Sequence, residues 1–283
     1  MDSAAATEQR FARRVPVPAT LLVGLAITAT VLLLAALAPA IAPYPYDEMS
    51  ILTRLKPPSS AHWLGTDDFG RDVLSRTLVG ARLSLAMGLG ATAISFILAV
   101  PLGLLAGYAR GWLDEAIMRA MDVLMSFPPI LLGLLILAVT PPSLWKAMVA
   151  VGIVYVPAIV RLTRGVTLEI GQEEFIDAAR ARGDGTAYIL FREILPNAWP
   201  PLAVEAGLRI TFAILLGSSL SFLGLGPQPP SSEWGLMIAE SRQFIDQAPW
   251  IGLAPGLSLC VVLVAVNLFG EGLREALDPQ LLE

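Results

Sequence analysis

The sequence predicts an all-α integral membrane protein with six transmembrane helices. Hydrophobic residues make up 55% of the 283 residues and charged residues only 15%, whereas a soluble domain usually carries about 25% charged residues. The mean hydropathy is +0.67. Six apolar stretches approach or exceed the roughly 20 residues that cross a bilayer as a helix. Because lipid offers the backbone no hydrogen-bond partners, these long apolar runs must be helices rather than the short alternating strands of a membrane barrel.

In chain order, the expected spans cover about residues 20–41, 80–108, 117–140, 146–168, 199–223 and 249–271. Together they form one membrane domain over residues 20–280, after an N-terminal segment of residues 1–19. The first span follows a basic stretch, as the core of a signal peptide does. Its apolar core is longer than the roughly 7–15 residues of a cleaved signal, so we expect it to remain as a span.

Lys and Arg residues suggest the orientation. Arg10, Arg13 and Arg14 precede the first span, and cytoplasmic segments are enriched in such residues, so the N-terminus is expected inside. Six spans then place the C-terminus inside as well. The proline-containing segments 43–78 and 225–250 become external loops. Residues 62–76 are expected to fold along the membrane face before the second span.

Several kinds of chemistry are excluded or disfavoured. A net charge of −5 without a long basic run implies no nucleic-acid partner. Neither Lys56 nor Lys146 follows a glycine, so the chain has no Walker phosphate-binding loop. His62, the only histidine, is expected to be a solvated loop residue, and Cys260, the only cysteine, a small buried residue of the sixth span. We therefore expect no catalytic, cofactor-binding or metal-binding residue in this chain.

The fifth span contains two charged residues, Glu205 and Arg209. They lie four residues apart with the acid first, a spacing that favours an ion pair on one helix face. The interpretation we prefer is a self-neutralised pair near the cytoplasmic end of the span. The alternative is a polar contact that lines a transport pathway.

The most informative feature is the polar segment 174–197, EFIDAARARGDGTAYILFREILPN, between the fourth and fifth spans. We call it the cassette. It predicts a helix, a turn and a second short helix. A membrane protein has little physical reason to carry such a segment unless a protein outside the membrane grips it. An ordinary interfacial amphipathic loop remains the alternative.

Each part of the cassette has an expected mechanical use. The adjacent Ala178 and Ala179 keep the first helix thin enough to enter a groove on another protein. Gly183 lets the chain leave that helix through a left-handed residue. Pro196 is expected to begin a turn into the fifth span. Two further groups have expected contacts: Glu173, Asp177 and Arg180 with charges across an interface, and Tyr188, Ile189 and Phe191 with the membrane domain.

The cassette resembles the EAA motif of ABC-importer permeases, in which Glu-Ala-Ala is followed by a glycine and later by Ile-x-Leu-Pro. Asp177 stands in place of the first Glu. Ile194 lies one place later than the isoleucine of the motif, whose own place is taken by Glu193. These departures keep the pattern of the motif and change its charge details.

Residues 62–85, 220–238 and 267–279 are similar to the second permease subunit of the dipeptide/oligopeptide/nickel permeases, and the resemblance extends over about residues 20–280. One departure concerns the cargo. Many peptide permeases carry an acid shortly before the LSFLGLG stretch, where this chain has Gly217-Ser218-Ser219. The resemblance therefore leaves the cargo open between peptides, nickel and other small solutes.

The resemblance implies the type I ABC-importer fold in a bacterial inner membrane and a non-enzymatic transport subunit. It implies four kinds of partner besides lipid: a homologous permease in a heterodimer, two ATP-binding subunits that hold ATP and magnesium, and an extracytoplasmic solute-binding protein. The cassette would be a cytoplasmic coupling helix seated on an ATP-binding subunit. The residues implied in that contact are Glu174, Asp177, Ala178, Ala179, Arg180, Gly183, Leu195 and Pro196.

Two other classes of protein remain as alternatives. A self-contained secondary transporter often shows internal repeats, and this sequence has no such repeat and few acids deep in its spans. A membrane scaffold without a transport role is the third possibility.

Overall fold

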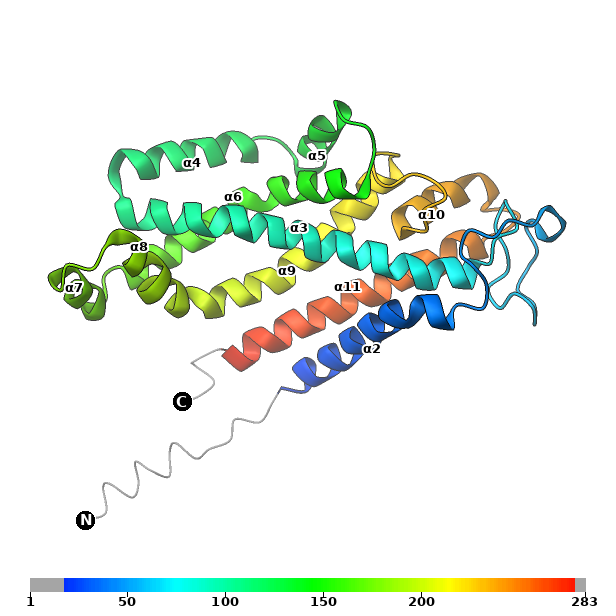
Figure 1. Cartoon of the computed structure of the whole chain (residues 1–283), viewed down its shortest axis with the longest axis horizontal. Helices are drawn as coiled ribbons and strands as arrows, with labels where there is room; N and C mark the ends of the chain where they lie inside the picture. The colour runs from blue at the N-terminus through cyan, green and yellow to red at the C-terminus, as the bar shows by residue number, and fades with distance from the viewer. Residues whose placement is uncertain (1–17, 278–283) are drawn as a thin grey trace, which may run out of the picture.

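A computed structural model of the chain describes residues 18–277, and the regular structure within that range is helical (Figure 1). The arginines at positions 10, 13 and 14, on which the expected orientation depends, and residues 278–280 of the expected domain lie outside the described range. Five long helices run side by side along the molecule: α2 (Ala19–Ile41), α3 (Val73–Ala109), α6 (Leu144–Ile170), α9 (Leu195–Phe222) and α11 (Trp250–Leu277).

Shorter helices connect or cover the long ones. They are α4 (Gly111–Met125), α5 (Pro129–Ala138), α7 (Glu174–Ala181), α8 (Thr186–Tyr188) and α10 (Trp234–Ser241), with 3-10 turns at Ile51–Thr53 and Arg242–Phe244 and a π-helical segment at Ile189–Ile194. Among the described residues, five helical runs are long and apolar enough to cross a membrane. The count becomes six if α4 and α5 together form one bent span.

Within the span expected over 117–140, two helices, α4 and α5, meet at an angle of 89°. The break falls at Pro128 and Pro129. A proline has no N–H to donate, and it disfavours helical geometry in the residue before it. Pro129 can nevertheless begin α5, because the first turn of a helix needs no N–H partner.

Helices α3 and α6 pack closely because small residues line their contact. A Cβ added at Gly103 would lie 2.5 Å from Thr163 Cβ, and one at Gly107 would lie 2.7 Å from Thr167 Cβ. Ser95 Oγ donates a hydrogen bond of 2.7 Å to the carbonyl of Gly152 across the same contact. Small residues let helix backbones approach closely. Such packing matters in a membrane because lipid is as apolar as the helices, so burying apolar area gives little stabilisation there.

Glycines also bring α11 against two neighbours. On one side, a Cβ at Gly207 of α9 would lie 3.2 Å from Gly270 Cα. On the other, a Cβ at Gly24 of α2 would lie 2.3 Å from the backbone nitrogen of Phe269. Helix α11 therefore lies between α2 and α9.

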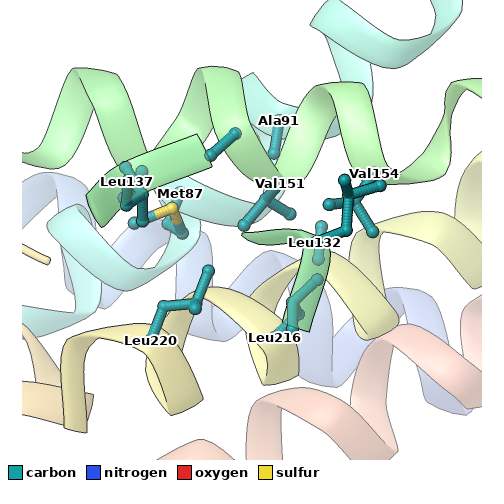
Figure 2. Close-up of a cluster of buried hydrophobic side chains, with 11 residues drawn as sticks. Met87, Ala91, Leu132, Leu137, Val151, Val154, Leu216 and Leu220 are labelled. Carbon is teal, nitrogen blue, oxygen red and sulfur yellow. The ribbon is translucent and has the colours of Figure 1, made fainter. Parts of the chain in front are cut away.

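Figure 2 shows the buried apolar cluster in which α3, α5, α6 and α9 meet. Leu132 and Leu137 pack α5 into this cluster, and Leu220 of α9 contacts Gly133 of α5. The remaining labelled members are Met87, Ala91, Val151, Val154 and Leu216. This cluster anchors α5 to the bundle after the break that separates it from α4.

The α3–α6 contact gives a prediction about stability. Gly103→Ala should lower the free energy of unfolding by about 1–3 kcal/mol, because the new Cβ meets Thr163 and the Val160 carbonyl. Gly165→Ala, on α6 where a Cβ meets nothing within 4 Å, is the matched control and should stabilise by about 0.5–1 kcal/mol. Thermal unfolding in detergent measures both. Equal melting temperatures for the two variants would contradict this packing.

Candidate functional site

The cassette folds into α7, a turn, α8 and the π-helical segment at one end of the molecule, and residues 43–72 lie at the opposite end (Figure 1). Gly183 has a φ of +83°, in the left-handed region, so the expected helix exit is present. The N–H of Gly183 donates to the Arg180 carbonyl and that of Asp184 to the Ala179 carbonyl. These bonds close the C-terminus of α7.

Helix α7 has one face against its own chain and one face free. Ile176 and Ala179 are fully buried, in a cluster with Leu104 of α3 and Ile194. Ala178 is exposed, since successive residues of a helix point about 100° apart. Of the two alanines expected to keep the helix thin, Ala179 therefore packs against its own chain and Ala178 faces outward. The free face carries Glu174, Asp177 and Ala178.

Arg180 contacts its own chain. Its Nη1 lies 2.9 Å from Asp177 Oδ1, and its guanidinium carbon lies 5.2 Å from the ring centroid of Tyr108, at the end of α3. The contact with Tyr108 raises the pKa of Arg180 above its ordinary value. Arg180, expected to pair with charges on a partner, thus contacts α7 and α3 while its side chain stays 44% exposed.

The second part of the cassette, residues 186–194, packs against the membrane domain with fewer side chains than expected. Ile189 is buried as expected, together with Leu190 and Ile194, but Tyr188 and Phe191 are 50% and 49% exposed. These aromatic side chains add apolar area to the outward surface of the cassette. Such a surface, acidic on α7 and aromatic beyond it, suits contact with another protein.

Pro196 does not begin a turn, because the helical run is continuous from Thr186 to Phe222. The π-helical segment Ile189–Ile194 directly precedes it. In an α-helix a proline ring clashes with the carbonyl four residues earlier, and a wider π turn relieves such crowding. Leu195 is half-buried and Pro196 exposed, and the fifth span continues from the cassette without a loop.

The predicted ion pair of α9 is present. Arg209 Nε lies 2.5 Å from Glu205 Oε1, and the two side chains are 20% and 16% exposed. The Arg209 guanidinium carbon lies 5.4 Å from the ring centroid of Tyr155 and 5.8 Å from that of Phe212. Two aromatic rings therefore hold the arginine in place.

This pair lies on a face of the bundle that leaves charged groups accessible. A cavity of about 560 Å³ adjoins Glu205, bounded also by Leu162 of α6 and Arg274 of α11. A second accessible ion pair, of 2.6 Å, joins Arg161 of α6 to Asp122 of α4, and both side chains are nearly half exposed. The sequence identified the α9 pair but not its relation to α6 and α11.

At the opposite end a buried charge cluster was missed by sequence reasoning. Asp67 accepts from Arg71 Nε at 2.6 Å and also from Arg76 Nη1. Arg76 Nη2 lies 2.9 Å from Glu240, which is near the C-terminal end of α10. These four residues tie segment 43–72 to α3 and α10. The available signal was the alternation of acids and arginines in TDDFGRDVLSR, immediately before an apolar helix.

The structure around this cluster changes three expectations. Residues Val73–Arg76 form the first turn of α3 rather than lying along the membrane face, and α3 begins before the expected position 80. His62 is only 15% exposed, with Nδ1 2.9 Å from Asp72 Oδ1, so it is not a solvated residue. Asp72 also caps α3 by accepting from the Ser75 N–H at 2.8 Å.

Segment 225–250 is more than an external loop. Glu233 and Trp234 are buried, and Glu233 caps α10 by accepting from the backbone N–H groups of Gly235 and Leu236. Trp234 Nε1 donates to the Thr77 carbonyl of α3 at 2.9 Å.

Cys260, expected to be buried, is exposed on α11. Among residues 18–277, no group of three or more His, Cys, Asp or Glu is arranged to hold a metal ion.

Comparisons with known proteins also identify a transport protein of the inner membrane. Residues 99–283 match the family described as binding-protein-dependent transport system inner membrane component, and residues 20–58 match the N-terminal TM domain of oligopeptide transport permease C.

Individual relatives match over most of the chain. It is 46% identical over 260 residues to the dipeptide transport system permease protein DppC of Alkalihalophilus pseudofirmus, covering 92% of this chain and 86% of that protein. It is 46% identical over 224 residues to the glutathione transport system permease protein GsiD of Pectobacterium atrosepticum, covering 79% and 74%. It is 42% identical over 264 residues to the di/tripeptide transport system permease protein DppC of Pseudomonas aeruginosa, covering 91% and 87%.

A solved structure supports the fold. An inward-facing conformation of the MetNI methionine ABC transporter contains a chain that superposes with a TM-score of 0.59 at 20% identity, covering 73% of this chain and 96% of that chain. At this identity the likeness concerns the arrangement of helices alone.

The two faces of α7 give a prediction from neighbouring alanines. Ala179→Leu should lower the free energy of unfolding by about 1–3 kcal/mol, because Ala179 is fully buried. Ala178→Leu should change it by less than about 0.5 kcal/mol, because Ala178 is exposed. Melting temperatures of the two purified variants measure the difference. A larger loss for Ala178→Leu would reverse the assigned faces.

Proposed function

Because this chain belongs to the family of binding-protein-dependent transport system inner membrane components, we propose that it forms half of a pathway for peptides or related small solutes and is moved through its cassette. It is a multi-pass permease subunit of an ABC importer in a bacterial inner membrane. Family membership decides against the secondary transporter and the scaffold. ATP and magnesium belong on separate ATP-binding subunits.

The geometry of α7 is the observation that carries the coupling role. Ile176 and Ala179 fix the helix to its own chain, and Glu174, Asp177 and Ala178 remain free on its other face. A helix that is anchored on one side and exposed on the other can transmit a push from a bound partner to the helices beneath. Of the residues implied by the EAA resemblance, Arg180 and Ala179 then position α7, Gly183 shapes its exit, and Leu195 with Pro196 joins it to α9.

This role sets the proposed orientation. The cassette faces the cytoplasm, where ATP is available, and residues 43–72 with the Asp67 cluster face the solute-binding protein outside. The ends of the chain then lie inside, as the six-span topology requires, with α4 and α5 as one bent span.

The names of the relatives support a peptide as cargo. Dipeptides, di/tripeptides and glutathione are all short peptides or peptide-like molecules. A nickel cargo rests on the wider family resemblance alone. The second half of the pathway is a homologous permease, so the functional unit is a heterodimer with two ATP-binding subunits.

Glu205 and Arg209 are proposed as pathway residues. Charged side chains within membrane spans rarely face lipid, because leaving water for hydrocarbon is costly. The accessible face with the α9 pair and the cavity beside Glu205 is therefore the face toward the partner permease and the pathway between them.

Two glycines of the cassette test the coupling role. Gly183→Val should abolish ATP-driven uptake and weaken co-purification with the ATP-binding subunits, because valine is strained at a φ of +83°. Gly185→Val is the matched control and should retain both, since Gly185 has a φ of −68° and open space around it. Uptake into proteoliposomes containing the whole importer measures the effect. Normal association and uptake with Gly183→Val would remove the coupling role.

A further inference from the structure

The accessible residues of α9 form one continuous stripe. Glu205, Leu208, Phe212, Leu215 and Ser219 follow one another at spacings of three or four residues, which places them on one face of the helix. On one side α9 contacts α6, where the Tyr155 hydroxyl donates to the Phe212 carbonyl at 3.1 Å. On the other side Gly207 contacts Gly270 of α11. The stripe lies between these two contacts, and cavities adjoin it at Glu205 and at Ser219. We call the stripe with these two cavities the trough.

The trough contains polar groups at its two ends, with the apolar Leu208, Phe212 and Leu215 between them. Glu205 and Arg209 occupy one part of it, and a second cavity, of about 280 Å³, adjoins Ser219 farther along α9. Arg274 of α11 borders the cavity beside Glu205. Because lipid does not solvate such groups, the trough faces water or protein.

Two features distinguish the Glu205–Arg209 pair from an ion pair that only cancels its own charge: access to Glu205 from a cavity, and separate support of Arg209 by aromatic rings. Glu205 borders an open cavity of about 560 Å³, so a solute can approach this residue. The guanidinium of Arg209 is held independently by the rings of Tyr155 and Phe212. If a solute binds Glu205 and breaks its pair with Arg209, the two rings keep Arg209 in place, and its guanidinium can donate hydrogen bonds to the solute.

We propose that the Glu205–Arg209 pair is a contact site for a zwitterionic solute, with its ammonium group on Glu205 and its carboxylate on Arg209. The proposal rests on the pathway role proposed above and specifies its chemistry. One internal ion pair is exchanged for two intermolecular pairs, so no charge is left unpaired. A peptide with free ends carries both groups, whereas a simple cation or anion can satisfy only one member of the pair.

Neutralising both residues separates this role from a structural one. Glu205→Gln and Arg209→Gln should each lower ATP-driven uptake of dialanine by about tenfold or more, because charge-assisted hydrogen bonds are lost. The double variant should be at least as defective. If the pair serves only to cancel its own charge, the double variant regains uptake, and the proposal is overturned.

A second ion pair provides the control. Arg164 and Asp114 join α6 to α4 through two hydrogen bonds of 2.5 and 2.6 Å. The double variant Asp114→Asn/Arg164→Gln should take up more dialanine than either of its single variants, as expected for a pair whose role is internal. Monodispersity and melting temperature of each assembled importer establish that the compared variants are folded.

Thiol labelling tests contact with the solute without depending on uptake. Cys260 is the only cysteine, so Cys260→Ala provides a cysteine-free background. In the assembled importer, Leu208→Cys in the trough should react with a charged methanethiosulfonate reagent, and dialanine should slow the reaction. Leu257→Cys, on α11 beside a separate apolar cavity with α2 and α3, should react slowly and show no protection.

The blocked peptide N-acetyl-dialanine methylamide decides the chemical class. Protection by dialanine and none by the blocked peptide supports the zwitterion site. Equal protection by the two, or none by either, overturns it. Loss of the proposed function gives a different result: the wild-type importer itself then shows no ATP-driven uptake of dialanine, whatever the labelling at position 208.

Discussion

Close approach of helices through small residues is the constraint on which this structure depends. Helices in lipid gain little from burying apolar area against one another, so packing must come from contact of their backbones and small side chains. Gly103 and Gly107 allow that contact between α3 and α6, and Gly207 and Gly270 allow it between α9 and α11. Larger residues at these positions would separate the helices that carry every feature discussed above.

Helix α3 connects the two ends of the molecule. At 37 residues it is about 55 Å long. Near one end, Leu104 and Tyr108 contact α7 of the cassette, and near the other, Arg76 joins the Asp67 cluster and Glu240. The surface proposed to meet the ATP-binding subunit and the segment proposed to meet the solute-binding protein are therefore both in contact with one continuous helix, near its two ends.

Charge is handled differently at two places in the chain. In the Asp67 cluster, Arg71 and Arg76 are almost completely buried and share one carboxylate. Breaking a buried pair leaves an uncompensated charge, which is strongly destabilising, so this cluster fixes the position of residues 43–72. The Glu205–Arg209 pair keeps access to a cavity and can change partners. Burial thus distinguishes a structural cluster from a candidate contact site.

The sequence by itself determined the class of protein, the long helices, the cassette with its left-handed Gly183 and the pairing of Glu205 with Arg209, because these depend on hydropathy, local backbone preference and spacing along one helix. Tertiary structure decided which residues face the protein: Ala179 inward and Ala178 outward, Tyr188 and Phe191 exposed, and Cys260 on the surface. It also decided the burial of α10 and the meeting of Asp67 with Arg76 and Glu240. Spacing along one helix gives relative directions only, and which direction is buried depends on neighbours that are distant in the sequence.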